Sequence, residues 1–242
     1  MKALVLAAGY ATRLYPLTKD RPKPLLKVGD KAIVEHILEK IESLSEIDEV
    51  FIVTNDRFYQ HFVNWQSNYT YSKKITLVND GTLSNEDRLG AVGDLNYVIN
   101  KESIDDDLLV IAGDNLFGFS LQKFMNTYNG RSMVALRDLK DVEKVRNKHG
   151  VAVTEGSKVV QFQEKPAEPL SSLASTACYI FSSDDLLLVN SLVEQGIVDN
   201  PGDLIVSLVE SSEIHGFVFD EHWFDIGSHE SLKEAEEMYR EN

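Results

Sequence analysis

Apolar positions in the first half of the chain follow two different periods. Residues 33–44 carry apolar side chains every three or four positions, which predicts a helix lying against a sheet, with Asp30 in position to cap it. Helices are also predicted over 56–66 and 89–99. Short continuous apolar runs, typical of buried parallel strands, occupy residues 2–6, 50–53, 75–78 and 108–112.

The second half shows shorter apolar segments with fewer helical patterns between them. An acidic helix over 228–240 closes the chain. Strands are predicted over 133–137, 151–154, 159–163, 176–181 and 214–219. No Gly/Ser/Pro linker, low-complexity tract or internal repeat divides the halves. The pattern predicts one α/β domain over residues 1–242, with a Rossmann-like mixed, mostly parallel sheet flanked by helices.

Charge and cysteine content narrow the functional classes. Thirty-nine acidic and 24 basic residues give a net charge of −15, which disfavours nucleic acid and anionic membranes as partners. A small phosphorylated substrate would then need basic side chains gathered at one site. Cys178 is the single cysteine, which excludes an intramolecular disulfide, and the first apolar run lacks the pattern of a signal peptide. These features predict a cytoplasmic protein.

Chemistry concentrates in residues 6–26, LAAGYATRLYPLTKDRPKPLL. Ligands of such sheets bind at the carboxyl ends of the strands, so the loops after Leu6 and Ala112 are expected to lie together. Small residues let the backbone approach a ligand, while Arg13 and Lys23 bring positive charge suited to phosphate. The loop matches neither GxxxxGK[ST] nor GxGxxG. Taken alone, it could also be a tight turn with surface cations.

The same loop resembles the signature LAAGxGTRLxPLTxxxPKPLL of the sugar-1-phosphate nucleotidylyltransferases, the glucose-1-phosphate thymidylyltransferase and uridylyltransferase group. The chain departs from it at Ala11, which replaces the second glycine. Alanine disfavours a positive φ, so a slightly different loop path is expected. The resemblance implies the nucleotide-diphospho-sugar transferase fold. It also implies that the nucleotide is bound by Leu6, Ala8, Gly9, Tyr10, Ala11, Thr12, Arg13, Lys23, Gly90 and Asp114.

Three later segments resemble further motifs of that family in the same order. Gly113-Asp114-Asn115 follows a buried strand, and 223–228 reads WFDIGS. The segment 113–115 could be an ordinary turn by itself, but the resemblance implies that Asp114 and Asp225 hold Mg²⁺. With Glu164-Lys165-Pro166 it implies a sugar-phosphate site of Gly150, Glu164, Lys165, Thr176 and Asp203. The implied catalytic residues are Arg13, Lys23, Asp114, Lys165 and Asp225.

The implied reaction transfers a nucleotidyl group from a nucleoside triphosphate to a sugar 1-phosphate and releases pyrophosphate. UTP or dTTP with glucose 1-phosphate is favoured. Residues 77–95 lack the family's Gln and Pro-x-Gly run, so only Gly90 is assigned near the base. The alternatives are a CTP-dependent cytidylyltransferase for phosphocholine or another sugar phosphate, and a catalytically silent nucleotide-sugar-binding subunit. The chain ends soon after the closing helix, so simple Michaelis kinetics are expected, and the oligomeric state is left open.

Overall fold

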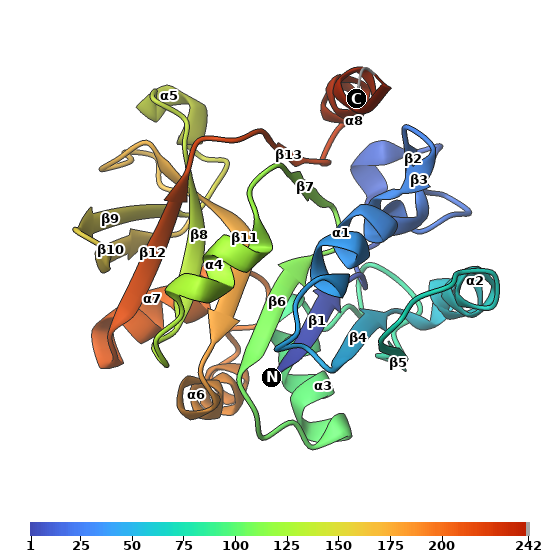
Figure 1. Ribbon diagram of the computed structural model, residues 1–242, viewed down its shortest axis with the longest axis horizontal. Coiled ribbons are helices and arrows are strands. Elements are labelled where there is room, and N and C mark those ends of the chain that lie inside the picture. The colour runs from blue at the N-terminus through green and yellow to red at the C-terminus, as the bar shows by residue number, and fades with distance from the viewer. Residues whose placement is uncertain (241–242) are drawn as a thin grey trace.

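A nine-stranded mixed sheet runs through the computed structural model, which describes residues 1–240 (Figure 1). The sheet order is β5-β4-β1-β6-β11-β8-β12-β10-β9. The first four strands in this order are mutually parallel: β5 (Lys74–Asn79), β4 (Glu49–Thr54), β1 (Lys2–Leu6) and β6 (Leu108–Ala112). The predicted strands of the first half are therefore confirmed, including the common direction that brings their carboxyl ends to one edge.

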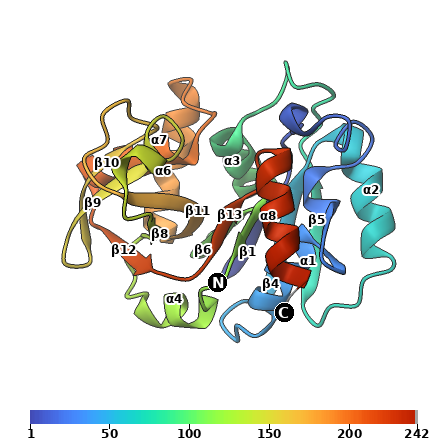
Figure 2. The ribbon, with the colours of Figure 1, turned by 90° about the horizontal axis from the view of Figure 1, so that it is seen from above.

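The second half of the sheet is mostly antiparallel. Its strands are β11 (Leu173–Phe181), β8 (Met133–Asp138), β12 (Ile214–Phe219), β10 (Lys158–Gln163) and β9 (Val151–Glu155). Only β8 and β12 run parallel among these neighbours, and β11 joins the halves by pairing antiparallel with both β6 and β8. Figure 2 shows the two halves side by side, with β1 and β6 between them. The sheet is mixed, as predicted, but it is not mostly parallel. Four of its neighbouring strand pairs are parallel and four are antiparallel, because β8 to β11 follow one another without the long helical crossovers that parallel pairing needs.

Small elements lie over the carboxyl edge of β1 and β6. They are η1 (Thr12–Leu14), η2 (Lys23–Leu25), a hairpin of β2 (Lys27–Val28) and β3 (Lys31–Ala32), and a two-stranded ladder of β7 (Asn115–Phe117) and β13 (Trp223–Asp225). The prediction that Asp30 caps the first helix is wrong. Helix α1 (Ile33–Glu42) begins after Ala32, because Gly29 and Asp30 form the turn between β2 and β3. Glu35 instead accepts from the Ala32 amide at 2.7 Å.

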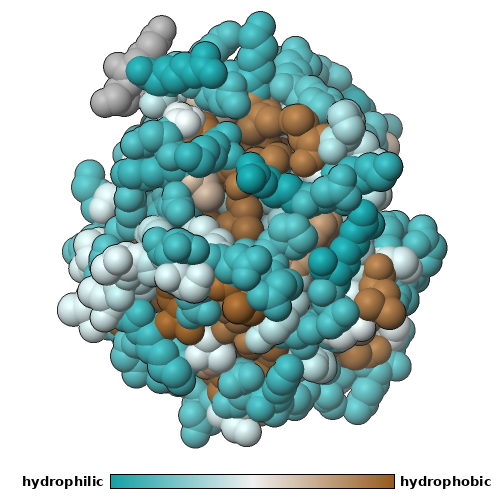
Figure 3. Space-filling view, turned by 90° about the vertical axis from the view of Figure 1, so that its right-hand side faces the viewer, coloured by the Kyte–Doolittle hydropathy of each residue, from teal (hydrophilic) through white to brown (hydrophobic). Residues whose placement is uncertain are grey.

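Much of the surface is hydrophilic. On the face that lies to the right in Figure 1, hydrophobic residues show through only in separate groups (Figure 3). Within residues 1–240, no helix combines the length and the apolar character needed to cross a membrane.

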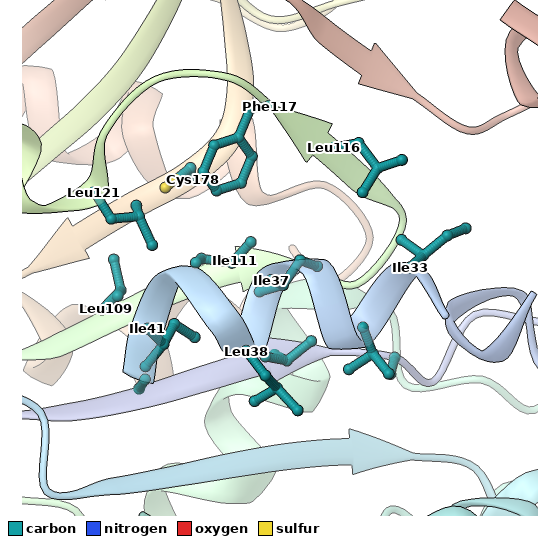
Figure 4. Close-up of a cluster of buried hydrophobic side chains, with 14 of the residues drawn as sticks. Ile33, Ile37, Leu38, Ile41, Leu109, Ile111, Leu116, Phe117, Leu121 and Cys178 are labelled. Atoms are coloured by element: carbon teal, nitrogen blue, oxygen red, sulfur yellow. The ribbon is translucent and has the colours of Figure 1, made fainter. Parts of the chain in front are cut away.

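Two apolar cores lie on opposite faces of the sheet, because successive residues of a strand point to opposite sides. In β6, Leu109 and Ile111 belong to one core, while Leu108 and Val110 belong to the other. The first core lies under α1, whose apolar side chains cover β6 and approach Cys178 (Figure 4). It also takes residues from α2 (Asp56–Gln66), α4 (Leu121–Thr127) and α8 (His229–Arg240).

The second core is covered by α3 (Ala91–Glu102), α6 (Ser183–Glu194) and α7 (Pro201–Ser211). The sequence pattern did not identify α6 and α7. In α6 the run Leu186 to Val189 has no polar interruption, and Leu187 is 78% exposed, so the apolar spacing hides the buried face. A short helix α5 (Val142–Val145) completes the fold. Cys178 belongs to the first core, and its thiol is fully buried.

Candidate active site

The loops that follow β1 and β6 meet at the carboxyl edge of the sheet, as predicted. The Gly113 amide donates to the Leu6 carbonyl oxygen at 2.8 Å, which extends the pairing of the two strands by one residue. A Cβ atom on Gly113 would lie 2.8 Å from that same oxygen, so the approach requires glycine. Together these loops form the floor of a cleft of about 380 Å³, called the main cleft below.

The main cleft brings together residues from distant parts of the chain. The loop after β1 gives it Leu6 to Gly9, Ala11 and Lys23, and the loop after β6 gives it Asp114. Other residues that line it are Gly90, Ala91, Asp94, Lys165, Ala177, Asp199, Pro201 and Asp225. Three basic side chains line it, namely Lys23, Arg88 and Lys165. These are the cations that a phosphorylated ligand would use in a protein of net charge −15, and four aspartates, Asp94, Asp114, Asp199 and Asp225, line the same cleft.

Ala11 keeps the left-handed conformation despite its side chain. Its φ is +48°, which is the positive value that an alanine side chain disfavours, and the expected difference in loop path from the family stays a prediction. Two hydrogen bonds to its carbonyl oxygen hold it there, from Thr18 Oγ1 at 2.7 Å and from the Leu14 amide at 3.0 Å. Ala177, at the irregularity in β11, is also left-handed with a φ of +51°. Both alanines line the main cleft, where the surrounding contacts outweigh the backbone preference.

Lys23 and Asp114 form an ion pair in the cleft floor. Lys23 Nζ lies 2.5 Å from Asp114 Oδ2 and donates to the Ile226 carbonyl oxygen at 2.9 Å. Burial alone would raise the pKa of Asp114, but the charge and hydrogen bond of Lys23 hold it below its ordinary value. Asp114 is therefore a carboxylate at neutral pH.

Asp225 lies beside Asp114 although 110 residues separate them in sequence. The β7–β13 ladder places Asp225 opposite Asn115, and the Ile226 amide donates to the Asp114 carbonyl oxygen at 3.0 Å. Loss of hydration and then the charge of Asp114 raise the pKa of Asp225 to about 6. Two carboxylates in one cleft repel each other, and a bound cation would relieve that repulsion. Residues 1–240 contain no group of three or more His, Cys, Asp or Glu suited to a metal ion, so further ligands would be other oxygen atoms, of the protein or of a bound substrate.

A hydrogen-bonded chain holds Asp114 in place from behind. Asn115 Nδ2 donates to Asp114 Oδ1 at 2.7 Å, and Asn115 Oδ1 accepts from Trp223 Nε1 at 2.6 Å. Asn115 is almost fully buried, so these bonds are shielded from water. The carboxylate of Asp114 therefore has one oxygen on Asn115 and the other on Lys23.

Arg13 lies at the rim of this arrangement. Its guanidinium lies 3.3 Å from the position that a Cβ atom on Gly227 would take. Its positive charge partly offsets the rise in the pKa of Asp225 that burial and Asp114 cause. Arg13 itself is exposed at the start of η1. The structure thus brings Arg13, Lys23, Asp114 and Asp225 into one neighbourhood.

A smaller side pocket of about 140 Å³ opens from the main cleft and shares Asn115, Lys165 and Asp225 with it. Gly150 and Glu164 face each other there, because a Cβ atom on Gly150 would lie 3.0 Å from Glu164 Oε2. Burial raises the pKa of Glu164, although the charge of Lys165 opposes this shift. Three predicted residues, Gly150, Glu164 and Lys165, are therefore together.

The remaining predicted sugar-phosphate residues are placed differently. Thr176 borders the side pocket, but it is fully buried and its hydroxyl donates to the Ala135 carbonyl oxygen at 3.0 Å. Asp203 lines neither the main cleft nor the side pocket. It accepts from Asn200 Nδ2 at 3.3 Å, and Asn200 Oδ1 in turn accepts from Lys165 Nζ at 2.6 Å. Asp203 thus reaches Lys165 only through Asn200.

Tyr10 and Thr12 also do not line the main cleft. Tyr10 is 3% exposed and its hydroxyl shares a hydrogen bond of 3.1 Å with Thr82 Oγ1, while Thr12 begins η1 on the outside of the loop. The Tyr10 side chain ties the loop to Thr82, and direct nucleotide contact by Tyr10 or Thr12 stays a prediction.

Three charged residues of the main cleft were not foreseen from sequence. Arg88 and Asp199 form an ion pair of 3.2 Å that joins two loops at the cleft wall, and Asp94 lies one turn into α3. Asp94 had a detectable signal, since it interrupts the otherwise apolar face of Val92, Leu95 and Val98. No local pattern marked Arg88 or Asp199, because their pairing spans 111 residues.

Comparison with known proteins identifies the family of the chain. The family model described as "Nucleotidyl transferase" matches residues 2–242. Among curated relatives, a bifunctional protein GlmU of Methanocaldococcus jannaschii is 28% identical over 97% of this chain and 53% of its own length. A UTP–glucose-1-phosphate uridylyltransferase of Synechocystis is 30% identical over 94% of this chain and 60% of its own. The chain thus spans about half to three fifths of these relatives.

Solved structures share the fold over the whole chain. A putative glucose-1-phosphate thymidylyltransferase from Bacillus anthracis superposes with a TM-score of 0.82 and 26% identity, covering 100% of this chain and 96% of that one. A UDP-glucose pyrophosphorylase complexed with UDP-glucose gives 0.81 at 22% identity, covering 99% and 98%. This second likeness concerns the fold alone.

Proposed function

The chain belongs to the nucleotidyl transferase family, and from this premise we propose that it transfers a nucleotidyl group from a nucleoside triphosphate to a sugar 1-phosphate. The observation that carries the proposal is the convergence of Lys23, Asp114 and Asp225 where β1 and β6 end. An ammonium and two carboxylates at the carboxyl edge of a parallel sheet suit a substrate with several phosphates.

The reaction needs positioning and charge neutralisation more than it needs a protein nucleophile. An oxygen of the sugar phosphate, already ionised, forms a new bond to the α-phosphorus while the bond to the bridging β-phosphate oxygen breaks. Pyrophosphate carries away the electron pair, so no proton transfer is required. Lys23 and Arg13 would stabilise the charge on the triphosphate, and Lys165 would orient the acceptor phosphate.

Asp114 and Asp225 fit a divalent cation of the Mg²⁺ type. Mg²⁺ prefers one or two carboxylates together with oxygens of substrate phosphates, which agrees with the carboxylate pair at the floor of the main cleft. When bound, the ion would neutralise charge on the α-phosphate. The protein's own contribution is to keep Asp114 ionised through Lys23 and aligned through Asn115.

The side pocket suits the sugar of the acceptor. The Glu164 carboxylate points into the space between Gly150 and Gly202. A side chain at either glycine position would approach the Glu164 carboxylate too closely. A carboxylate there could accept from sugar hydroxyls. Glucose 1-phosphate and UTP or dTTP are the favoured pair, in keeping with the names of the Synechocystis and Bacillus relatives. A relative from Sulfolobus acidocaldarius, a putative mannose-1-phosphate guanyltransferase, is 29% identical, so GTP with mannose 1-phosphate belongs in the same test. We place the reaction in the cytoplasm, in keeping with a single buried thiol.

The direct test is pyrophosphate release. The protein is incubated with Mg²⁺, glucose 1-phosphate or mannose 1-phosphate, and UTP, dTTP, CTP, ATP or GTP in turn. Asp114→Ala and Asp225→Ala should each lower turnover at least ~100-fold, because each removes a charge that acts on the reacting phosphate. Asp105→Ala is the matched control, since Asp105 is exposed before β6, at the opposite end of that strand, and its loss should leave the rate unchanged.

Release with one triphosphate, lost in both cleft variants and kept in the control, would establish the reaction. Absence of release with every pair, together with tight binding of a nucleotide sugar, would favour a silent binding subunit instead.

A further inference from the structure

The ammonium group of Lys23 engages Asp114 at the point where a divalent cation is expected to bind. Lys23 Nζ lies 2.5 Å from Asp114 Oδ2 and donates to the Ile226 carbonyl oxygen at 2.9 Å, so it contacts both segments that carry the carboxylate pair, Asp114 and Asp225. The other carboxylate oxygen, Asp114 Oδ1, accepts from Asn115 Nδ2 at 2.7 Å. Both oxygens of Asp114 are therefore engaged by donors of the protein itself.

The Lys23–Asp114 ion pair is largely shielded from water, yet both residues line the main cleft. The exposed fraction is 12% for the Lys23 side chain and 27% for the Asp114 side chain. Charges that are partly buried are screened much less than charges at an open surface. Lys23 is thus a strong counter-ion for Asp114, and a ligand in the cleft can still reach the carboxylate.

A divalent cation on Asp114 would meet the Lys23 ammonium at short range. Mg²⁺ binds carboxylate oxygens at about 2.0–2.1 Å. An ion on Asp114 Oδ2 would therefore lie within ~4.6 Å of Lys23 Nζ where the structure places it. Positive charges at this separation repel each other strongly in a site shielded from water. Tight binding of the ion requires the ammonium to move away from Asp114.

A triphosphate would offer Lys23 a different anionic partner in the same cleft. An ammonium group has three N–H donors, and the contacts of Lys23 within residues 1–240 use them on Asp114 and Ile226. Its four-carbon stem is flexible, so Nζ can move from one acceptor to another without a change in the backbone. The same side chain can therefore serve Asp114 first and a phosphate oxygen afterwards.

We propose that Lys23 is a resident counter-ion of Asp114 that competes with the divalent cation until a triphosphate binds the ammonium instead. This inference rests on the proposed function, in which Lys23 binds the triphosphate and Asp114 binds the cation. Lys23 weakens cation binding to the protein alone and favours it once phosphate oxygens hold the ammonium. The cation and the triphosphate therefore bind cooperatively, and each raises the affinity for the other.

The first test is Mn²⁺ binding without nucleotide, followed by electron paramagnetic resonance, because Mn²⁺ takes the same oxygen ligands as Mg²⁺. Lys23→Met removes the ammonium and should bind Mn²⁺ at least ~10-fold more tightly than wild type. Lys23→Arg keeps a positive charge and should stay within ~3-fold of wild type. Lys165→Met is the matched control and should also stay within ~3-fold. Lys165 lines the same cleft, but its ammonium contacts Glu164 and Asn200 rather than Asp114.

The second test is calorimetric binding of UTP, dTTP, CTP, ATP and GTP in turn, with Mg²⁺ and without acceptor. Lys23→Met should bind the preferred triphosphate at least ~10-fold more weakly than wild type, because it lacks the ammonium that would contact the phosphates. This change is opposite in sign to the change in Mn²⁺ affinity. Thermal unfolding checks that the variants are folded. Lys23→Gln keeps an N–H donor without the charge, and it replaces Lys23→Met in both tests if that variant does not fold.

A purely structural role of Lys23 predicts different results. Loss of its contacts would then misalign Asp114, and Lys23→Met would bind Mn²⁺ no more tightly than wild type. That result would overturn the inference. Equal tightening by Lys165→Met would overturn it as well, because the effect would then come from the general charge of the cleft. Failure of wild type to bind any of the five triphosphates would contradict the transfer of Lys23 to a phosphate.

The outcomes for the two proposals are separable. Opposite changes in Mn²⁺ and triphosphate affinity in Lys23→Met, without pyrophosphate release by wild type, would support this inference and contradict the proposed catalysis. Pyrophosphate release by wild type, together with unchanged Mn²⁺ affinity in Lys23→Met, would do the reverse.

Discussion

Ala11 and Asp94 show how single residues in the cleft are held against their intrinsic preferences. Ala11 has a left-handed backbone that disfavours any side chain, and Asp94 is a carboxyl group largely shut off from water. Hydrogen bonds to its carbonyl oxygen hold Ala11 in this conformation. Asp94 is tolerated in its buried position because its raised pKa favours the neutral, protonated form. Residues of this kind concentrate where a ligand must be approached closely.

Replacing Ala11 with glycine should stabilise the protein. The left-handed conformation costs an alanine roughly 1–2 kcal/mol, part of which is offset by the greater freedom of glycine in the unfolded chain. We expect Ala11→Gly to raise the free energy of unfolding in urea by about 0.5–1 kcal/mol. Ala235→Gly, in the middle of the right-handed helix α8, is the control and should lower it by ~1 kcal/mol. Destabilisation by Ala11→Gly would mean that the loop does not hold this conformation.

Asp94 should make stability depend on pH in a defined direction. Its pKa is raised from the ordinary carboxyl range to about 8 in the folded state, and the pKa of Asp80 is raised as well. The folded protein therefore binds more protons than the unfolded chain between pH ~4 and ~8, and stability is lost as pH rises through that window. Asp94→Asn cannot ionise, so its free energy of unfolding at pH 5, 7 and 9 should fall less than that of wild type. Equal slopes for the two proteins would count against a protonated Asp94.

At the scale of elements, the short β7–β13 ladder is decisive because it brings two distant aspartates together. It pairs Asp225 with Asn115, and Trp223 holds Asn115, which in turn holds Asp114. Neither strand exceeds three residues. Their pairing is stable because the underlying sheet brings their flanking chains to the same edge.

Asn115→Ala should weaken Mg²⁺ binding by Asp114 and Asp225 without unfolding the protein. Losing a residue that orients a metal-binding carboxylate typically costs 10–100-fold in metal affinity or activity. We expect the Mg²⁺ concentration for half-maximal pyrophosphate release to rise by a factor in this range. Asn190→Ala removes a similar amide from the exposed Asn190–Glu194 bond of α6, and it should leave the Mg²⁺ dependence unchanged. An unaltered Mg²⁺ requirement in Asn115→Ala would show that Asp114 needs no such support.

At the scale of the whole molecule, the sheet makes its two halves depend on each other. Strand β11 lies between β6 and β8 although it comes after β8 in sequence, and the first core contains Cys178, Ile180 and Phe219 from the second half. Residues 1–130 by themselves would leave one edge of β6 and much of this core exposed.

We therefore expect a fragment of residues 1–130 to lack cooperative unfolding. Trp65 fluorescence in urea should change gradually in the fragment and sharply in the full chain, because a fragment without a complete core exposes little additional surface on unfolding. A sharp transition in the fragment would show that the first half is an independent folding unit.

Much of the fold could be read from local patterns. Four elements have the predicted bounds, namely the strands 2–6, 108–112 and 214–219 and the helix 56–66. The spacing and length of an apolar segment distinguish a strand from a helix without information from the rest of the chain. Helix α6 was not predicted, because its run of four consecutive apolar residues does not show the three- and four-residue spacing of an amphipathic helix. The first turn of α1 was misplaced because Gly29 and Asp30 serve a hairpin rather than a helix.

The sequence by itself determined the family and the loops after β1 and β6 that form the floor of the main cleft. It also determined the basic and acidic residues of that floor, because they belong to continuous motifs such as residues 6–26. Only the tertiary structure decided which side chains meet. The contact of Asp80 with Asp94, the ion pair of Arg88 with Asp199 and the path from Lys165 through Asn200 to Asp203 all join segments with no shared pattern. Such contacts depend on the order of strands in the sheet and on burial, which are properties of the folded chain and leave no local trace in the order of residues.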